Sequence, residues 1–309
     1  MELPQVKYTG AIRQVTVGTG PASITVGGQG CFAFHSFEGE IPNPPVIAYE
    51  IWDSGTQEWP EVCRRAYGKA LDDPVAWARH CRDERGARIL AVYLVSTDPT
   101  GLNRSSADAA KMVERIAAEV NLPLIVWGCG QIEKDAETLR LVAEACQGKN
   151  LALGPAEEKN YKQIGAAAIA YGHCVIASSP IDVNLAKQLN ILLLDLGVPE
   201  DRIVMDPTTG ALGYGIEYTY SVMERDRIAA LQQQDDKLAF PMVCFLGKEV
   251  WKTKEASLPS GAIPALGTEE RGIVMEAMTA ALLALAGADI LVMRHPKAME
   301  LFSRLEKEL

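Results

Sequence analysis

Apolar residues along the chain gather in eight short, nearly continuous runs, and longer segments with helical spacing separate these runs. A strand of a parallel sheet is covered on both faces, so its sequence is continuously apolar rather than alternating. Eight strand and helix pairs over roughly 260 residues match the usual size of a (β/α)8 barrel. The pattern therefore predicts a (β/α)8 TIM barrel, with a doubly wound open sheet as the alternative. The predicted strands are residues 46–53, 88–96, 123–129, 151–154, 174–179, 203–206, 242–247 and 289–295.

Residues that satisfy free backbone groups mark the predicted helix ends. Asp72 and Asp73 stand before Pro74, which predicts an N-cap followed by proline at the first helical position. Serine or aspartate marks two further helix starts, at residues 105–106 and 182. Glycine stands at three expected C-termini, Gly86, Gly197 and Gly287. The last helix is predicted from Pro296 to Leu309.

The first 45 residues follow a different pattern. Short β-like runs alternate with glycine, in IRQVTV from Ile12, SITVGG from Ser23 and CFAFHSF from Cys31. Such runs are typical of hairpins rather than of a helix. The sequence predicts an N-terminal β-hairpin extension over residues 1–45, packed on or plugging one end of a barrel that comprises residues 46–309.

Two of the predicted connections are unusual. Residues 206–215, DPTTGALGYG, contain one proline and three glycines and can be neither helix nor central strand, and a long helix is expected from Ile216 or Glu217. Residues 247–268 form a much longer connection than usual, and they are too polar and proline-rich for a helix. They are predicted to be an excursion over the barrel mouth that serves as a lid, a docking surface or a plain insertion.

Composition narrows the function classes. The formal net charge is -10 and the pI is about 5.0, so no general attraction to nucleic acid or to an anionic membrane is expected. No apolar run approaches the roughly 20 residues needed to span a bilayer, and the N-terminus lacks the features of a signal peptide. The seven cysteines are scattered, which argues against a CxxC-type metal or redox site and against a secreted disulfide framework. We expect a cytoplasmic protein.

The carboxyl ends of barrel strands carry the functional site in this fold, and here they form a polar ring. Carboxylates such as Asp98 and Asp206 could do acid–base chemistry, although such residues more often fix loops or bind a polar ligand. No catalytic set stands out. The ring consists of Asp53, Ser96, Thr97, Asp98, Gln131, Glu133, Glu157, Lys159, Asn160, Ser178, Ser179, Asp206, Arg294 and His295.

Several enzyme classes lack their characteristic residues. No predicted strand contains the lysine of a Schiff-base aldolase, which disfavours a barrel lyase. The four histidines are isolated, so no zinc site or other metal site is predicted. A GxSxG elbow, a P-loop and a GxGxxG after a strand are absent.

Two loops share a DPT core, at residues 98–100 and 206–208. Asp-Pro-Thr turns offer side-chain hydrogen bonds and free N–H groups. Two such loops at one barrel mouth would suit a polar, amide-rich molecule, although turn chemistry explains each loop by itself.

Three segments carry a resemblance to a known family. MDPTTGALGYGIEYTYSVMER from Met205, ITVGG from Ile24 and EAMTAALLALAGADILVMRHP from Glu276 resemble the small subunit of the corrinoid iron-sulfur protein, equivalently the delta subunit of acetyl-CoA decarbonylase/synthase. The similarity covers essentially the whole chain. The resemblance implies a (β/α)8 barrel related to pterin-binding methyltransferases.

The resemblance also implies partners and cofactors. In this family the barrel forms a heterodimer with a large subunit, which carries a [4Fe-4S] cluster and a corrinoid-binding domain. The corrinoid lies between that domain and the barrel. A methyltetrahydrofolate:corrinoid methyltransferase supplies the methyl group, and acetyl-CoA synthase/CO dehydrogenase receives it in the reductive acetyl-CoA pathway. Cluster ligation needs closely spaced thiolates, and the scattered cysteines of this chain are consistent with a cluster on the large subunit.

The hypothesis for this chain is a non-catalytic barrel whose mouth caps the partner's corrinoid. The alternative is a pterin-dependent methyltransferase barrel that acts on its own. Backbone donors and small residues suit the amides and the flat ring of a corrin. The predicted cofactor-facing residues are Asp206, Thr208, Thr209, Gly210, Gly213 and Tyr214, with Ser96, Asp98 and Asn103 beside them.

Overall fold

The computed structural model describes residues 5–210, 212–257 and 268–306. Eight parallel strands are hydrogen-bonded in the order β8-β7-β6-β5-β4-β3-β10-β9. A parallel bridge between Met205 and Met242 joins the two outer members, so the sheet closes into a barrel. This closure confirms the barrel and excludes the open sheet. The strands are β3 Val46–Trp52, β4 Ile89–Tyr93, β5 Leu124–Trp127, β6 Ala152–Ala156, β7 Cys174–Ser178, β8 Ile203–Asp206, β9 Val243–Cys244 and β10 Ile290–Met293.

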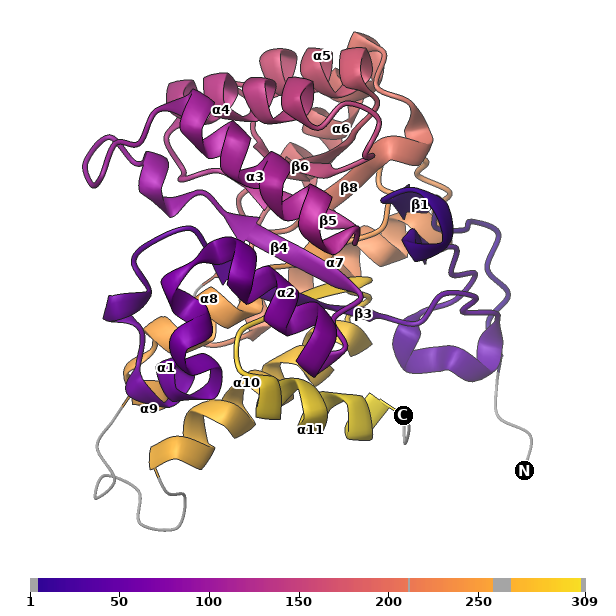
Figure 1. Ribbon diagram of the computed structural model, residues 1–309. Coiled ribbons are helices and arrows are strands. Elements are labelled where there is room, and N and C mark those ends of the chain that lie inside the picture. Colours follow the sequence, from indigo (N-terminus) through magenta and orange to yellow (C-terminus); the bar gives the residue numbers. More distant parts are fainter. Residues whose placement is uncertain (1–4, 211, 258–267, 307–309) are drawn as a thin grey trace.

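Helices surround the strands (Figure 1). Several begin where the sequence predicts: Asp73 and Asp182 accept hydrogen bonds from backbone N–H groups of the first turn, as does Ser105. The helices are α1 Glu61–Tyr67, α2 Pro74–Arg85, α3 Ser106–Val120, α4 Ile132–Ala145, α5 Tyr161–Tyr171, α6 Val183–Leu196, α7 Glu217–Leu231, α8 Leu246–Lys252, α9 Lys254–Ser257, α10 Thr268–Leu285 and α11 Pro296–Glu306. Short 3-10 turns are η1 Gly20–Ala22, η2 Ala33–Glu38, η3 Thr56–Glu58, η4 Gly68–Asp72, η5 Val95–Thr97 and η6 Glu200–Arg202.

The N-terminal hairpin pairs β1 Gln14–Val17 with β2 Ile24–Gly27 in antiparallel register. Its buried valine and isoleucine side chains join the apolar cluster that fills the barrel interior. Asn150, which stands just before β6, donates its amide to the carbonyl of Thr16 at 2.7 Å. The hairpin therefore plugs the amino end of the barrel, as Figure 1 shows with β1 at one end of the sheet.

Two predictions of local structure are wrong. The run CFAFHSF is not a strand, because Ala33–Glu38 forms the 3-10 turn η2. Residues 246–257 are not an irregular excursion, since they form α8 and α9. Lys252, Lys254 and Glu255 are exposed while Val250 and Trp251 are buried, so the segment is amphipathic. The remainder of that predicted excursion, residues 258–267, lies outside the described residues, as does the end of the last predicted helix.

Candidate functional site

Asp206 closes β8 at the carboxyl end of the barrel and is buried there. Its carboxylate accepts a hydrogen bond from the Ser178 hydroxyl at 2.7 Å and another from the Thr208 backbone N–H at 3.0 Å. Burial raises the pKa of Asp206 to about 7 even though both hydrogen bonds favour its charged form. Near neutral pH this carboxyl can therefore either accept or donate a hydrogen bond.

The glycine-rich loop after β8 is fixed by hydroxyl groups. Thr208 has a left-handed backbone (φ 63°), and its hydroxyl donates to the carbonyl of Ser179. On α7 the Thr219 hydroxyl accepts the Gly210 N–H at 3.3 Å and donates to the Thr208 carbonyl at 3.2 Å. Thr209 is buried and Tyr214 is 90% exposed. Asp206, Thr208 and Gly210 are thus held in one compact turn.

The second predicted loop, after β4, is organised separately. Ser96 is buried, and both its backbone N–H and its hydroxyl donate to Asp53. Asp98 accepts from the N–H and the hydroxyl of Thr100, both at 2.8 Å. Asn103 is exposed in a left-handed conformation. Ser96 is therefore engaged by Asp53, and Asp98 and Asn103 shape the loop. Within the described residues no hydrogen bond joins this loop to the loop after β8.

Aromatic side chains occupy the centre of the mouth. The rings of Trp127 and Phe245 lie 3.9 Å apart between centroids, and Tyr93 is 5.9 Å from both Phe245 and Trp52. Lys248, on the first turn of α8, places its ammonium 5.7 Å from the ring centroid of Tyr93 and 6.0 Å from that of Trp52. Burial lowers the pKa of this lysine. The mouth thus has an aromatic floor with a cation above it.

A buried ionic network supports this floor. Glu50 accepts hydrogen bonds from the Arg294 guanidinium at 2.8 and 3.2 Å, and the guanidinium stacks 4.0 Å from the centre of the Trp59 ring. Glu276 accepts from Trp251 Nε1 at 2.7 Å and from the backbone N–H of Arg294, and its burial raises its pKa to about 7. The network therefore links β3, β10, α8 and α10.

The sequence-based reasoning missed Lys248, Glu50 and Glu276. A signal existed for the two carboxylates, because Glu50 interrupts the apolar run VIAYEIW and Glu276 begins the apolar stretch EAMTAALLALAG. An ionisable group in a fully covered element must be paired or neutralised. Lys248 gave no such signal, because the segment that contains it was expected to be irregular.

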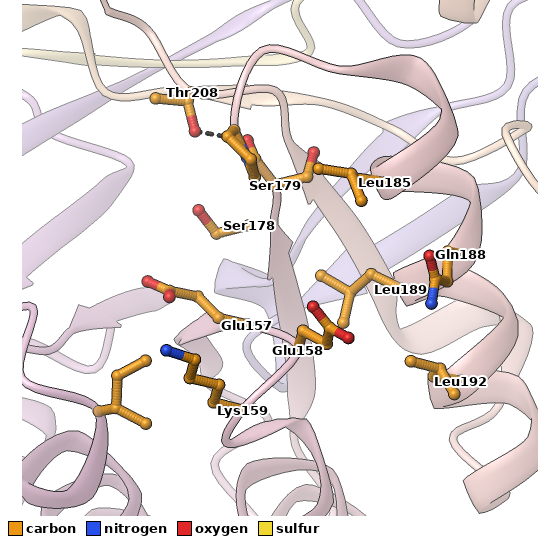
Figure 2. Close-up of a pocket in the computed structure, with 12 residues that line it drawn as sticks. Glu157, Glu158, Lys159, Ser178, Ser179, Leu185, Gln188, Leu189, Leu192 and Thr208 are labelled. Carbon is orange, nitrogen blue, oxygen red and sulfur yellow. Dashed lines mark hydrogen bonds between the residues drawn. The ribbon is translucent and has the colours of Figure 1, made fainter.

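A pocket of about 410 Å³ opens beside the glycine-rich loop. Figure 2 shows Leu185, Leu189 and Leu192 on one helix facing it, with Glu157 and Lys159 across from them. Ser178, Ser179 and Thr208 also contribute to its lining. Because Ser178 and Thr208 also bind Asp206, the pocket and the mouth share residues.

Comparison with known proteins identifies the family. The family model of the CO dehydrogenase/acetyl-CoA synthase delta subunit matches residues 14–307. The chain belongs to this family. It is 36% identical to the acetyl-CoA decarbonylase/synthase complex subunit delta of Archaeoglobus fulgidus over 95% of this chain and 67% of that relative. For the delta subunit of Methanothermobacter thermautotrophicus the identity is 35%, over 98% of this chain and 77% of the relative.

Solved structures share the fold of this delta-family chain at low identity. Dihydropteroate synthase from Xanthomonas albilineans, with 4-aminobenzoic acid, aligns with a TM-score of 0.57 and 15% identity, over 86% of this chain and 93% of that one. Dihydropteroate synthase from Stenotrophomonas maltophilia aligns with a TM-score of 0.55 and 13% identity, over 91% of this chain and 97% of that one. This likeness establishes the barrel fold alone. None of the described helices is both long enough and apolar enough to cross a bilayer. Within the described part of the chain, no group of three or more metal-ligating side chains could hold an ion.

Proposed function

We propose that this delta-family chain is the small subunit of a heterodimeric corrinoid iron-sulfur protein, and that its barrel mouth caps the corrinoid held by the large subunit. The observation that carries the proposal is that aromatic side chains close the carboxyl end of the barrel. Its centre is filled by Trp127, Phe245 and Tyr93, so a ligand lies across this surface rather than within the barrel. A flat molecule with polar groups at its edge suits such a surface.

The rim of the mouth supports contact with an apolar ring. Large apolar side chains are exposed on the loops and helix starts of this end, at Leu102 (69%), Tyr214 (90%) and Tyr218 (57%). A Cβ atom at Gly213 would meet no heavy atom of the described residues within 4 Å, so this backbone is open to close approach. Exposed apolar groups beside unobstructed backbone are typical of a ligand or partner surface.

The chemistry of these residues fits a corrinoid. The bound corrinoid would supply the cobalt that carries the methyl group. Hydroxyl, carboxyl and backbone groups of the turn formed by Asp206, Thr208, Thr209 and Gly210 would meet the amide side arms. Gly213 and Tyr214 would meet the ring. Ser96, Asp98 and Asn103 would lie beside them. The aromatic layer would exclude water from below.

Partners complete the proposal. The large subunit would carry the [4Fe-4S] cluster, since cluster ligation needs closely spaced thiolates and the seven cysteines of this chain are distributed over separate elements. A methyltetrahydrofolate:corrinoid methyltransferase would deliver the methyl group, and acetyl-CoA synthase/CO dehydrogenase would receive it. Free thiols suit a reducing compartment, so the proposal places the complex in the cytoplasm.

Absorption spectra and a methyl-transfer assay test the proposal together. The chain is purified alone and with the large subunit, and each sample is given methyltetrahydrofolate with free cobalamin. We expect corrinoid and cluster absorption only in the two-chain complex, and no methyl transfer by the single chain. If the single chain binds the pterin and methylates cobalamin, the alternative of an independent pterin-dependent methyltransferase replaces the proposal.

A further inference from the structure

The pocket beside the mouth has two chemically different walls. Leu185, Leu189 and Leu192 on α6 form an apolar wall, and Glu157, Glu158 and Lys159, which follow β6, lie across from it (Figure 2). Leu185 is 41% exposed although it lines the pocket. The pocket has a volume of about 410 Å³, within the roughly 300–1,000 Å³ of small-ligand sites. An occupant would bury an aliphatic portion against the leucines.

The polar wall has unused hydrogen-bonding capacity. The backbone N–H of Glu157 donates a hydrogen bond to the side-chain oxygen of Asn160 at 2.7 Å, so only the backbone of Glu157 is engaged there. In the described structure no hydrogen bond or ion pair reaches the Glu157 carboxyl, and its partial burial raises its pKa. Lys159 lies close enough to favour the charged form of Glu157. A hydrogen-bond acceptor and a cationic donor therefore stand side by side.

Such a wall selects a neutral group that both donates and accepts. A cationic group would be repelled by Lys159, and an anionic group would be repelled by Glu157 and Glu158. A primary carboxamide satisfies both, because its NH₂ donates to a carboxylate and its oxygen accepts from an ammonium or a hydroxyl. Methylene groups that carry the carboxamide would lie against the leucines.

We propose that this pocket binds one carboxamide-bearing side arm of the corrinoid, with Glu157 as the acceptor and Leu185 packing on the methylenes. The inference rests on the proposed function, because a corrinoid lying across the mouth brings amide arms to its edge. Thr208 belongs to both surfaces, and Gly210 lies close to Ile181 in the loop between β7 and α6. The pocket is thus continuous with the surface assigned to the amide side arms.

The test measures how much the corrinoid strengthens subunit association. The dissociation constant of the full chain is determined with the corrinoid-loaded large subunit and with the corrinoid-free one. Leu185→Trp fills the pocket from an exposed position, and Ile169→Trp on α5, 44% exposed and outside the pocket, is the matched control. We expect Leu185→Trp to reduce the affinity gain from the corrinoid by about tenfold, the effect of one hydrogen bond with its apolar contact. Ile169→Trp should leave that gain unchanged.

A series of corrinoids with one added negative charge identifies which side-arm amide enters the pocket. The large subunit is reconstituted with cobalamins in which a single side-arm amide is hydrolysed to a carboxylate. One derivative should weaken association with the wild-type chain, and Glu157→Gln should restore it by removing the repulsion. The pocket assignment is wrong if the corrinoid strengthens association but neither Leu185→Trp nor Glu157→Gln changes the ratio of the dissociation constants compared in its experiment. If the wild-type chain binds loaded and corrinoid-free partner equally well, the proposed function fails, and the pocket assignment fails with it.

Discussion

The two ends of the barrel are built from the same eight strands but are finished in opposite ways. At the amino end the hairpin buries Val15, Val17, Ile24 and Val26 in the barrel interior. At the carboxyl end an aromatic layer closes the interior, and Tyr214, Leu102 and Gly213 remain open to solvent or to a partner. The hairpin at the amino end therefore contributes to stability, and under the proposed function the exposed rim of the carboxyl end serves recognition. Substitutions at the two ends should separate these effects.

The largest effect is expected beneath the carboxyl mouth. Arg294→Met leaves the buried Glu50 without its ion-pair partner and should lower the free energy of unfolding by about 3–5 kcal/mol. Urea denaturation measures it. The matched change at an exposed ion pair, Arg140→Met beside Glu144, should cost at most about 0.5 kcal/mol. Equal effects of the two substitutions would contradict the role of the buried network.

The amino end should respond through packing. Ile24→Ala removes a buried side chain of the hairpin and should cost about 3 kcal/mol in unfolding free energy, with no change in affinity for the corrinoid-loaded partner. Tyr214→Ala at the carboxyl end should show the reverse, with stability unchanged within about 0.5 kcal/mol and weaker partner binding. Titration of each folded variant with the large subunit checks the pair. A binding defect in Ile24→Ala but not in Tyr214→Ala would show that the amino end, and not the carboxyl end, binds the partner.

A helix cap at the carboxyl end should have a smaller effect. Asp182 accepts the N–H groups of Asn184 and Leu185 at 2.8 and 3.0 Å and so begins α6, which forms the apolar wall of the pocket. Asp182→Ala should cost about 1 kcal/mol of unfolding free energy, and Asp182→Asn should recover most of it. Failure of asparagine to recover stability would show that the cap does not act through these hydrogen bonds.

The remaining predictions concern pH, and the pH dependence of stability has opposite signs at the two ends. Asp206 keeps a proton in the folded state up to about pH 7 but loses it near pH 3.8 when unfolded, so its stabilising contribution declines as pH rises between these values. Burial lowers the pKa of His173 at the amino end, so the unfolded chain takes up a proton first, and stability is lost as pH falls below 6.5. Asp206→Asn should reduce the loss of stability as pH rises, and His173→Gln should reduce the loss of stability as pH falls below 6.5. Urea midpoints across pH 4–8 measure both. Glu276 and Asp226, each with a pKa raised to about 7 by burial, retain part of the slope in Asp206→Asn.

The strands could be predicted because each is a continuous apolar run, and the helix starts because Asp73, Ser105 and Asp182 are local capping residues. Helices α8 and α9 were missed because their stability comes from tertiary burial, of Val250 and Trp251 in α8 and of Ala256 in α9, rather than from local composition. The turn η2 was missed because the aromatic residues of CFAFHSF favour a strand only when a partner strand is present. The domain boundary at residue 45 stays a prediction.

The candidate site was only partly predictable. The glycine-rich loop is marked in the sequence by Asp206, Pro207 and its glycines, and the structure does bring Asp206, Thr208 and Gly210 together. The pairing of Glu50 with Arg294 joins residues at opposite ends of the chain, so no local pattern reports it. Lys248 depends on the unexpected helix α8 and on two aromatic rings from other strands. The contacts of all nine predicted residues with a corrinoid remain proposals.

Hydrogen–deuterium exchange of this chain, bound to the corrinoid-loaded or to the corrinoid-free large subunit, reports directly which end of the barrel meets the corrinoid. We expect the corrinoid to add protection to backbone amides of residues 96–103 and 212–218 at the carboxyl end, and none to residues 14–27 of the hairpin. Corrinoid-dependent protection of the hairpin, with the carboxyl loops unchanged, would contradict this expectation.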